Sequence, residues 1–411
     1  MNESPRTDLL DIFHSALRAV NGRNAVREYL QTHPIAEKVY LVAIGKAAAS
    51  MALGAQDVLG EKIIDALVIT KTGHCDQDLP FACLEAGHPV PNEASLDAGR
   101  SLLSFIDNMP AEATIVFLIS GGASALVEVL PEGVGLEDLR RVNDWLLASG
   151  LDITQMNRLR KSLSCIKAGR LATYLQGRPT LNLMISDVPR DDPAVIGSGL
   201  LVPDASKVSF DESTLPKWLE DLISLASTSP AFNDACFQNI RHAIVARNQD
   251  AISAAHNSAL TKVYEVYLHQ NLIMGDALHC GEQFARELLA QPPGLHIWGG
   301  ESTVSLPEKP GRGGRNQSLA LAAARVLQGH EDVYMLAGGT DGTDGPTEDA
   351  GALVDGTTVA RGTGKGLDAD DCLRRADAGT FLDASGDLIR TGPTGTNVMD
   401  LVLGLKLKQC Q

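Results

Sequence analysis

One arrangement recurs along this chain of 411 residues: an apolar run suited to a buried strand ends in a polar, glycine-containing turn, and a helical pattern follows. The apolar runs end at Ile44, Ile119, Ile185, Trp298 and Ala337. Strands that alternate with helices build α/β domains, and open α/β sheets bind ligands beyond the carboxyl ends of their strands. The sequence therefore predicts an α/β protein that uses these turns to bind a ligand.

The length of the chain predicts two domains, because 411 residues are too many for one core. The stretch Val202–Phe237 is richer in Ser, Pro and Asp than its surroundings and has a weaker periodicity, which is typical of a boundary. We therefore expect an N-terminal domain over residues 1–237 and a C-terminal domain over residues 238–411.

Composition excludes several classes of protein. The formal net charge of -16 argues against a nucleic-acid partner, since phosphate backbones need a basic surface. No apolar run reaches the roughly 18 to 20 residues that span a bilayer, and Met1–Leu10 has no signal-peptide core. The seven cysteines are scattered without a CxxC pair, which predicts reduced thiols and neither a zinc site nor a disulfide framework. We expect a cytoplasmic protein with no membrane partner.

Four further elements are predicted from hydrophobic periodicity. Helices are expected over Asp8–Leu30, Asp152–Gln176 and Val398–Leu407, and a strand over Lys262–Tyr267. The last of these helices is a candidate to pack back on the N-terminal domain.

The loop Gly299–Arg315 and the helical pattern that follows it indicate an anion site. Exposed backbone N–H groups and the helix dipole favour negative charge at such a start, and Arg315 can bind oxygens in bidentate fashion. Asn316 is placed as the helix N-cap. The alternative is a flexible surface loop that carries a solvated arginine.

Two turns in the N-terminal half favour the same chemistry. Lys46 follows a strand directly and precedes a helix, where the helix dipole disfavours a cation unless an anion lies nearby. In the turn Ser120–Ser124, Gly121 and Gly122 let the backbone approach a phosphate and the serines add hydroxyls. A lysine that extends into solvent and a plain strand-to-helix turn are the alternatives.

Acidic and basic residues near other strand ends leave several roles open. Asp187 suits a metal ligand, a general base or a helix N-cap. Asp341 and Asp344 can hold Mg²⁺ through oxygen ligands, or belong to a capped surface turn. The basic segment Asn157–Lys161 is either a solvated helix face or part of a ligand site. His88, like His74, is interpreted as a polar loop histidine.

Two common nucleotide motifs are missing. The sequence has no GxxxxGK[ST] loop, and it has no GxGxxG after a strand with an acidic residue about 20 positions further on. A nicotinamide dinucleotide site therefore has little support.

Seven motifs, in this order, resemble those of the glycerate 2-kinase family, the bacterial type with a C-terminal MOFRL domain. The resemblance covers nearly the whole chain. The motifs are Val42–Ala47, Gly87–Asn92, Leu118–Leu126, Ile185–Val188, Gly300–Val304, Gly313–Gln317 and Gly339–Pro346.

The resemblance implies a Rossmann-like, three-layer parallel sheet in the N-terminal domain and an active site in the cleft between two α/β domains. It implies ATP-dependent phosphorylation of D-glycerate at the 2-hydroxyl, giving 2-phosphoglycerate, with Mg²⁺. The key charges of the family correspond to Lys46 and Arg315.

The remaining roles are hypotheses about this chain. Asp187 accepts the hydroxyl proton, and Asp341 and Asp344 bind the metal. Glu301 and Asn397 contact the substrate. ATP phosphates are assigned to Ser120, Gly121, Gly122, Ser124, Gly313, Gly314 and Asn316.

Two other functions stay open at this point. Some members of the family carry the name hydroxypyruvate reductase, an NAD(P)H-dependent activity. A non-catalytic protein that binds sugar acids would also use anion-binding loops. The sequence does not fix the oligomeric state, and it allows a homodimer.

Overall fold

The computed structural model describes residues 4–204 and 215–408. It divides into two compact units: unit 1 comprises Met1–Asn21 and Ala246–Gln411, and unit 2 comprises Gly22–Val245. The predicted boundary at residue 237 lies close to the end of unit 2, and the structure groups the first helix with the residues that follow unit 2.

The first helix, α1 (Pro5–Ala19), belongs to unit 1 because its side chains bind the second half of the chain. Arg6 Nη2 donates to Asp387 Oδ1 at 2.8 Å, and Lys262 Nζ donates to Asp8 Oδ1 at 2.7 Å. The predicted helix Asp8–Leu30 is in fact two helices, α1 and α2 (Gly22–Thr32), which fall in different units. The break comes at Asn21-Gly22, a turn signal that the periodicity of the flanking residues masks.

Unit 2 is built on a six-stranded sheet in the order β3-β2-β1-β4-β5-β6. From β3 to β5 all neighbouring strands are parallel, and Ile44 lies opposite both Ile69 and Ile119. The turns that follow β1 and β4 therefore start at the same level of one sheet edge, and β2 continues past this level to Lys71. The strands are β1 (Val39–Ile44), β2 (Ile63–Lys71), β3 (Ala82–Ala86), β4 (Thr114–Ile119), β5 (Thr180–Ile185) and β6 (Ile240–Ala246).

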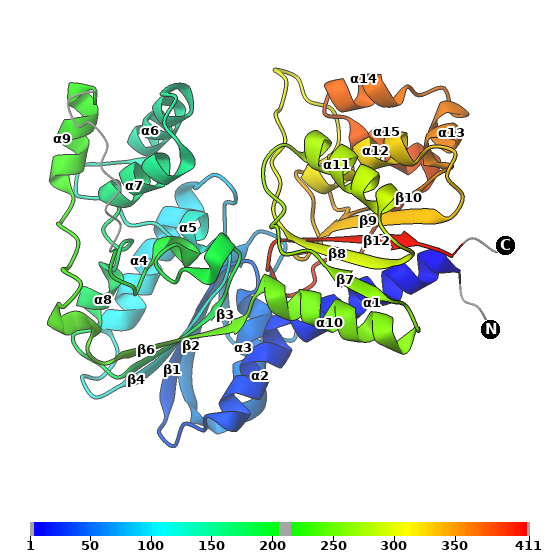
Figure 1. The fold of residues 1–411 in the computed structure, drawn as a ribbon. Coiled ribbons are helices and arrows are strands. Elements are labelled where there is room, and N and C mark those ends of the chain that lie inside the picture. Colours follow the sequence, from blue (N-terminus) through cyan, green and yellow to red (C-terminus); the bar gives the residue numbers. More distant parts are fainter. Residues whose placement is uncertain (1–3, 205–214, 409–411) are drawn as a thin grey trace. The chain divides into compact units, whose positions relative to one another are not determined.

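Helices cover both faces of this sheet, so the predicted three-layer α/β fold with a parallel sheet is confirmed (Figure 1). The main core lies between the sheet and α4 and includes Val42, Phe117 and Leu102. The helices of unit 2 besides α2 are α3 (Ala48–Leu59), α4 (Glu93–Asp107), α5 (Ala123–Leu126), α6 (Leu136–Ala148), α7 (Ile153–Leu163), α8 (Leu171–Tyr174), α9 (Lys217–Leu225) and the short 3-10 helices Gly60–Lys62, Pro189–Asp191, Ile196–Ser198 and Ala235–Phe237.

Helices α6, α7 and α9 form a small core of their own around Val142, Leu159 and Leu219. The predicted helix Asp152–Gln176 is here divided into α7 and α8. Ala168 and Gly169 lie between them with φ of 55° and 81°, a left-handed conformation that interrupts a right-handed α-helix.

Unit 1 is built on a second six-stranded sheet in the order β11-β10-β9-β12-β8-β7. It is mostly antiparallel, and only β7 and β8 run parallel to each other. The strands are β7 (Val266–Leu268), β8 (Gly294–Gly300), β9 (Val333–Gly339), β10 (Gly351–Asp355), β11 (Leu388–Ile389) and β12 (Asp400–Lys406).

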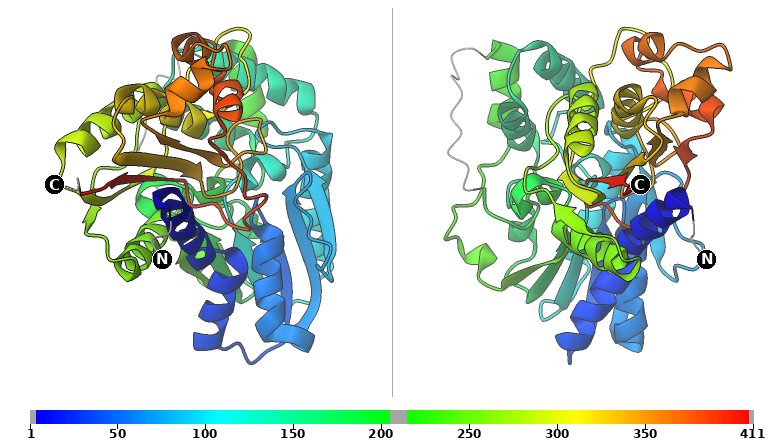
Figure 2. Two further views of the ribbon diagram at one scale, coloured as in Figure 1. Left: turned by 90° about the vertical axis from the view of Figure 1, so that its right-hand side faces the viewer. Right: turned by 45° about the vertical axis from the view of Figure 1, so that its right-hand side comes forward.

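One face of this sheet packs against α1 and α10, and the other against the layer that contains α11 and α12 (Figure 2). The core beneath α12 is rich in alanine, from Ala320 to Ala324, which lets the helix approach the strands closely. The helices of unit 1 besides α1 are α10 (Asn248–Thr261), α11 (Ala277–Ala290), α12 (Arg315–Leu327), α13 (Thr358–Thr363), α14 (Ala369–Arg374) and α15 (Ala378–Ser385).

The predicted last helix, Val398–Leu407, is wrong: the segment forms strand β12, between β8 and β9 at the centre of the sheet. Helices cover both faces of the sheet, so all but one of the β12 residues are buried and the strand reads as a continuous apolar run. The strand predicted over Lys262–Tyr267 is also misplaced, since β7 includes only Val266–Leu268.

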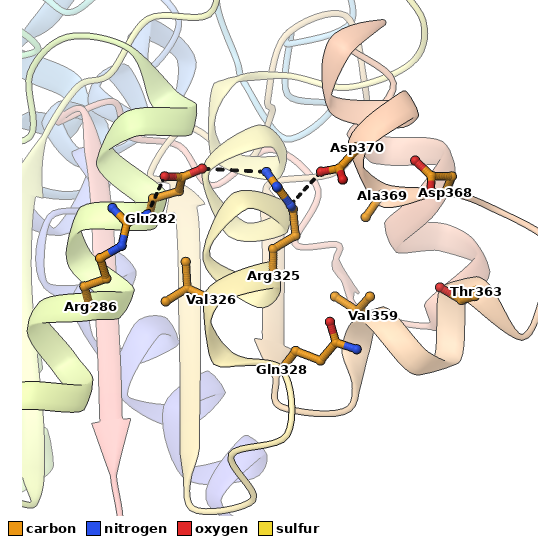
Figure 3. A pocket seen from close by; sticks show the side chains of 10 residues that line it. All are labelled: Glu282, Arg286, Arg325, Val326, Gln328, Val359, Thr363, Asp368, Ala369 and Asp370. Carbon is orange, nitrogen blue, oxygen red and sulfur yellow. Dashed lines mark hydrogen bonds and ion pairs between the residues drawn. The ribbon is translucent and has the colours of Figure 1, made fainter.

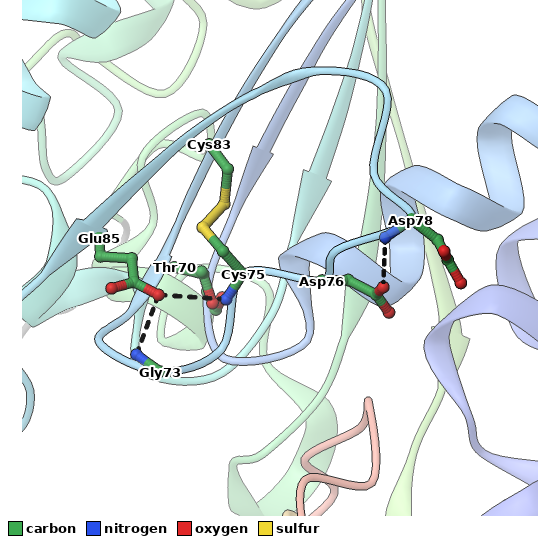
Figure 4. Close-up of a disulfide and its surroundings, with 8 residues drawn as sticks. Thr70, Gly73, Cys75, Asp76, Asp78, Cys83 and Glu85 are labelled. Atoms are coloured by element: carbon green, nitrogen blue, oxygen red, sulfur yellow. Dashed lines mark hydrogen bonds between the residues drawn. A yellow bond between two sulfur atoms is a disulfide. The ribbon is translucent and has the colours of Figure 1, made fainter.

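Cys75 and Cys83 form a disulfide in the loop that joins β2 to β3, which corrects the expectation that all the thiols are reduced (Figure 4). Glu85 Oε1 accepts hydrogen bonds from the Gly73 and Cys75 N–H groups in the same loop. Among the described residues the free cysteines are Cys165, Cys236, Cys280 and Cys372; Cys410 lies outside them. In the same part of the chain, no helix is both long and apolar enough to cross a bilayer.

Candidate active site

The turns after β1 and β4 are hydrogen-bonded to each other at the carboxyl edge of the unit 2 sheet. The Lys46 N–H donates to the Gly121 carbonyl at 2.9 Å, and the Ala47 N–H donates to Ser120 Oγ at 3.1 Å. Gly45 is required here, because a Cβ atom on it would lie 2.1 Å from Ser120 Oγ. The structure brings Lys46, Ser120 and Gly121 together, and Ser120 is fully buried, with its hydroxyl linking the two turns.

Gly122 lies at the centre of this edge with a φ of 85°. A Cβ atom on Gly122 would lie 3.0 Å from His88 Cδ2 and 3.2 Å from Lys46 Cγ. The half-buried side chains of Lys46 and His88 therefore both lie against the same glycine. The interpretation of His88 as an ordinary loop histidine missed this placement, because His88 follows β3 and reaches Gly122 only through the order of the strands.

Replacing Gly122 with alanine is expected to lower kcat/KM of the kinase reaction that the resemblance implies about 10- to 100-fold. The reason is that the new methyl group displaces Lys46 or His88. Its left-handed backbone adds a stability cost of about 1 kcal/mol. Gly133→Ala is the matched control: Gly133 has nearly the same φ, 84°, and nothing lies within 4 Å of its Cβ position. Steady-state kinetics and thermal unfolding of both variants test this; equal losses of activity would contradict it.

Two further predicted residues lie near this edge. Ser124 Oγ accepts a hydrogen bond from Ser198 Oγ at 2.7 Å, and Gly197, beside Ser198, packs closely against Ile119 and Ala123. Asp187 is half-buried and comes two residues after the end of β5, which pairs with β4. Asp187 therefore lies at the same edge of the sheet as the turns after β1 and β4.

In unit 1, Arg315 is the first residue of α12 and forms a bidentate ion pair with Asp400. Its Nε donates to Asp400 Oδ2 at 2.6 Å and its Nη2 to Oδ1 at 2.8 Å, while Nη1 lies 3.0 Å from Glu301 Oε1. Burial acts to lower the pKa of Arg315, but the charge and hydrogen bonds of Asp400 outweigh burial and raise it. The guanidinium is therefore oriented and largely neutralised by carboxylates of the protein itself, which the anion-site prediction did not anticipate.

The sequence predicted Asn316 as the N-cap of α12. In the structure, Asp344 caps the start of this helix. The Asn316 N–H donates to Asp344 Oδ1 at 3.1 Å, and the Gln317 N–H donates to Oδ2 at 2.8 Å. Gly314 precedes the helix, and a Cβ atom on it would lie 2.4 Å from the Asp344 carboxyl. Both oxygens of Asp344 thus accept backbone hydrogen bonds from the first turn of α12, and Asp344 caps this helix.

Burial raises the pKa of Asp344 from 3.8 to about 6, although hydrogen bonds from the Gln317 and Asn316 backbones act to lower it. A carboxyl whose folded-state pKa is raised stabilises the fold most below its unfolded pKa, and this stabilisation is lost as pH rises to about 6. Between pH 4 and pH 7 we expect the free energy of unfolding of wild type to fall by on the order of 2 to 3 kcal/mol relative to that of Asp344→Asn. Urea unfolding of both proteins across this range tests it; parallel pH profiles would contradict it.

Asp341 and Asn397 lie in two neighbouring loops of unit 1. Asp341 Oδ1 accepts the Thr343 N–H at 3.0 Å. Thr340 joins the two loops, because its Oγ1 donates to the Met399 carbonyl at 2.6 Å and accepts the Val398 N–H at 2.8 Å. Asn397 is mostly buried beside this junction. Within residues 4–204 and 215–408, no group of three or more His, Cys, Asp or Glu side chains is arranged to hold a metal ion.

Buried polar atoms remain without a hydrogen-bond partner near the Arg315–Asp400 pair. They are Ser302 Oγ, Asn316 Oδ1 and Thr396 Oγ1, and no described residue supplies a partner to any of them. Ser302 follows Glu301, Asn316 follows Arg315, and Thr396 precedes β12. Buried polar atoms are nearly always satisfied in native proteins, so these three favour a polar ligand or bound water at this edge.

Comparison with known proteins identifies the class of protein to which the chain belongs. Two family models match the chain: a domain of unknown function (DUF4147) over residues 8–218, and the MOFRL family over residues 294–400. The two six-stranded sheets and these matches define an α/β protein of the DUF4147 and MOFRL class.

Individual relatives identify the family. A D-glycerate 2-kinase of Thermotoga maritima is 37% identical over 98% of this chain and 99% of its own length. The crystal structure of glycerate kinase from Thermotoga maritima has a TM-score of 0.83 at 36% identity and covers 99% of this chain and 100% of that chain. A protein of Agrobacterium vitis, whose name assigns hydroxypyruvate reductase only provisionally, is 35% identical over 97% of this chain and 94% of its own length. The chain belongs to the glycerate 2-kinase family, as its motifs indicated.

Proposed function

We propose that this protein transfers the γ-phosphoryl group of ATP to the 2-hydroxyl of D-glycerate and releases 2-phosphoglycerate and ADP. Relatives named glycerate 2-kinase support the reaction. The observation that carries it in this chain is the double turn of unit 2, in which Gly121, Gly122 and Lys46 lie together at the end of two parallel strands. Phosphoryl transfer needs alignment and positive charge more than covalent help, and this turn supplies both.

Within this proposal the phosphates of ATP contact the N–H groups of Gly121 and Gly122, and Lys46 neutralises the transferred group. The 2-hydroxyl oxygen attacks the γ-phosphorus, the bond to the bridging oxygen breaks, and the hydroxyl proton passes to the Asp187 carboxylate. Asp187 suits this role because it lies at the sheet edge that carries the double turn.

Arg315 is already paired with two carboxylates of the protein, so it binds an anion only by exchanging one of them. Asp400 orients it from one side, whereas Glu301 is 40% exposed and therefore exchangeable. We propose that the glycerate carboxylate replaces Glu301 on Nη1 of Arg315, and that Asn397 and the unpartnered hydroxyls of Ser302 and Thr396 contact the substrate.

Mg²⁺, when bound with ATP, supplies positive charge to the phosphate oxygens. One or two carboxylates normally suffice for it because phosphates and waters complete its coordination. Asp341 meets that requirement in our proposal, and Asp344, whose oxygens cap α12, does not.

The reaction is tested by incubating the pure protein with Mg·ATP and D-glycerate and identifying the product by phosphorus NMR. We expect 2-phosphoglycerate; formation of 3-phosphoglycerate would contradict the proposed position of transfer, and glycerate binding without turnover would indicate a binding protein. The name of the Agrobacterium vitis relative keeps a reductase as the second candidate. Oxidation of NADH by hydroxypyruvate without ATP would support that alternative.

A further inference from the structure

A pocket of about 600 Å³ lies in unit 2 beside the Gly122 turn. His88, Gly122 and Ser124 line one part of it, and residues of α6 and α7, among them Asn143 and Arg160, line another. The sequence predicted ATP phosphates at Gly122 and Ser124, and either a solvated helix face or an unspecified ligand site for the segment that contains Arg160. Its volume is in the range of sites that hold drug-sized ligands, which is far more than a short hydroxy acid occupies.

Arg160 is a half-buried cation in this pocket without a carboxylate partner. Its Nε donates to Asn143 Oδ1 at 2.9 Å and its Nη1 to Asn157 Oδ1 at 3.2 Å, and no carboxylate within residues 4–204 or 215–408 pairs with it. Burial also lowers its pKa, with no acidic neighbour to raise it. Removing a guanidinium from water is costly unless an anion compensates it.

Another arginine that lines a pocket shows the difference. Arg325, in a pocket of about 380 Å³ in unit 1, has its Nε 2.7 Å from Asp370 Oδ1 and its Nη1 3.6 Å from Glu282 Oε1 (Figure 3). Glu282 also pairs with Arg286. The charges of that pocket are satisfied by the protein, whereas the charge of Arg160 is not.

The pocket beside Gly122 also has apolar walls that are open to solvent. Leu147 is 73% exposed and Val90 is 61% exposed, Pro89 and Pro91 lie with them, and the buried Leu139 also lines the pocket. Exposed apolar side chains that gather around polar groups mark ligand sites. A ligand that combines an anionic part with a flat ring face fits this lining, and a nucleotide has both.

We propose that this pocket binds the nucleoside diphosphate part of the phosphoryl donor, with Arg160 on a phosphate oxygen and Leu147 and Val90 against the base. Asp144, which also lines the pocket, is placed to accept hydrogen bonds from ribose hydroxyls. The identity of the ligand rests on the proposed function. The choice of contact residues rests on the lining of the pocket.

Calorimetric titration of the full chain with ADP and with inorganic tripolyphosphate tests the assignment. Leu147→Gln, at an exposed position that tolerates a polar residue, is expected to weaken ADP binding about 5- to 10-fold and to leave tripolyphosphate binding unchanged. Arg160→Gln is expected to weaken both ligands about 10- to 100-fold, and Arg160→Lys less. Leu225→Gln and Arg325→Gln are matched controls that line no part of this pocket, and both should bind ADP as wild type does.

Unchanged ADP binding in both Leu147→Gln and Arg160→Gln, with thermal unfolding like that of wild type, would overturn the proposal. Equal weakening of ADP and tripolyphosphate by Leu147→Gln would also overturn it, because that variant should affect the base alone. Failure of the pocket assignment can be distinguished from failure of the proposed reaction. If wild type binds ADP through these residues yet does not phosphorylate glycerate, the proposed reaction is wrong and the assignment of the pocket stands. If both variants keep glycerate kinase activity with an unchanged KM for ATP, the assignment of the pocket is wrong and the proposed reaction stands.

Discussion

Replacing Lys46 with methionine is expected to lower kcat about 10²- to 10³-fold while the fold remains intact, because a preorganised charge on the transferred group is lost. The Lys46 backbone is held by the Gly121 carbonyl, and its Cγ lies against Gly122. Methionine keeps most of the side-chain volume, so these contacts survive and only the charge disappears. Steady-state kinetics with Mg·ATP and D-glycerate measure the effect.

Lys62→Met is the matched control for the Lys46 prediction. Lys62 immediately precedes the amino end of β2, at the opposite edge of the same sheet, and its Nζ donates to the Ile35 carbonyl. It should therefore keep the wild-type kcat. If Lys46→Met turned over as fast as Lys62→Met, Lys46 would have no part in transfer and the double turn would be structural only.

The parts of the site that the sequence predicted are those that depend on local chain geometry. A strand that ends at Ile44 or Ile119 and continues into glycine can be recognised from its own residues, and parallel pairing then brings the two turns together. The sequence singled out Lys46, Gly121 and Gly122 in this way. The resemblance to a known family added the substrate and the cofactors.

The contacts that the sequence did not reveal join segments that are distant along the chain. Asp400 was placed within a predicted helix, and it meets Arg315 only because β12 pairs with β8 and β9 and sets Asp400 opposite Gly300 and Gly339. Asp344 caps a helix that begins 29 residues before it in the sequence, since 344 − 315 = 29. Arg160 became informative only when the structure showed that no carboxylate among the described residues pairs with it.

Replacing Arg315 with methionine is expected to reduce both stability and turnover, for two separable reasons. Asp400 is 1% exposed, so without Arg315 it becomes a buried carboxylate with no counter-charge, which costs about 3 to 5 kcal/mol of unfolding free energy. Turnover falls about 10²-fold or more because the oriented donor for the substrate carboxylate is gone. Glu301→Gln removes only the exposed partner and should cost less than about 1 kcal/mol.

The double variant Arg315→Met/Asp400→Asn separates these effects. Removing both charges should restore stability by about 1 to 2 kcal/mol relative to Arg315→Met alone, because no unpaired buried charge remains. Turnover should stay low, since the guanidinium is still missing. Urea unfolding and steady-state kinetics on wild type, both single variants and the double variant complete the cycle. Recovery of activity together with stability would show that Arg315 serves the fold alone, and the substrate carboxylate would then need another partner.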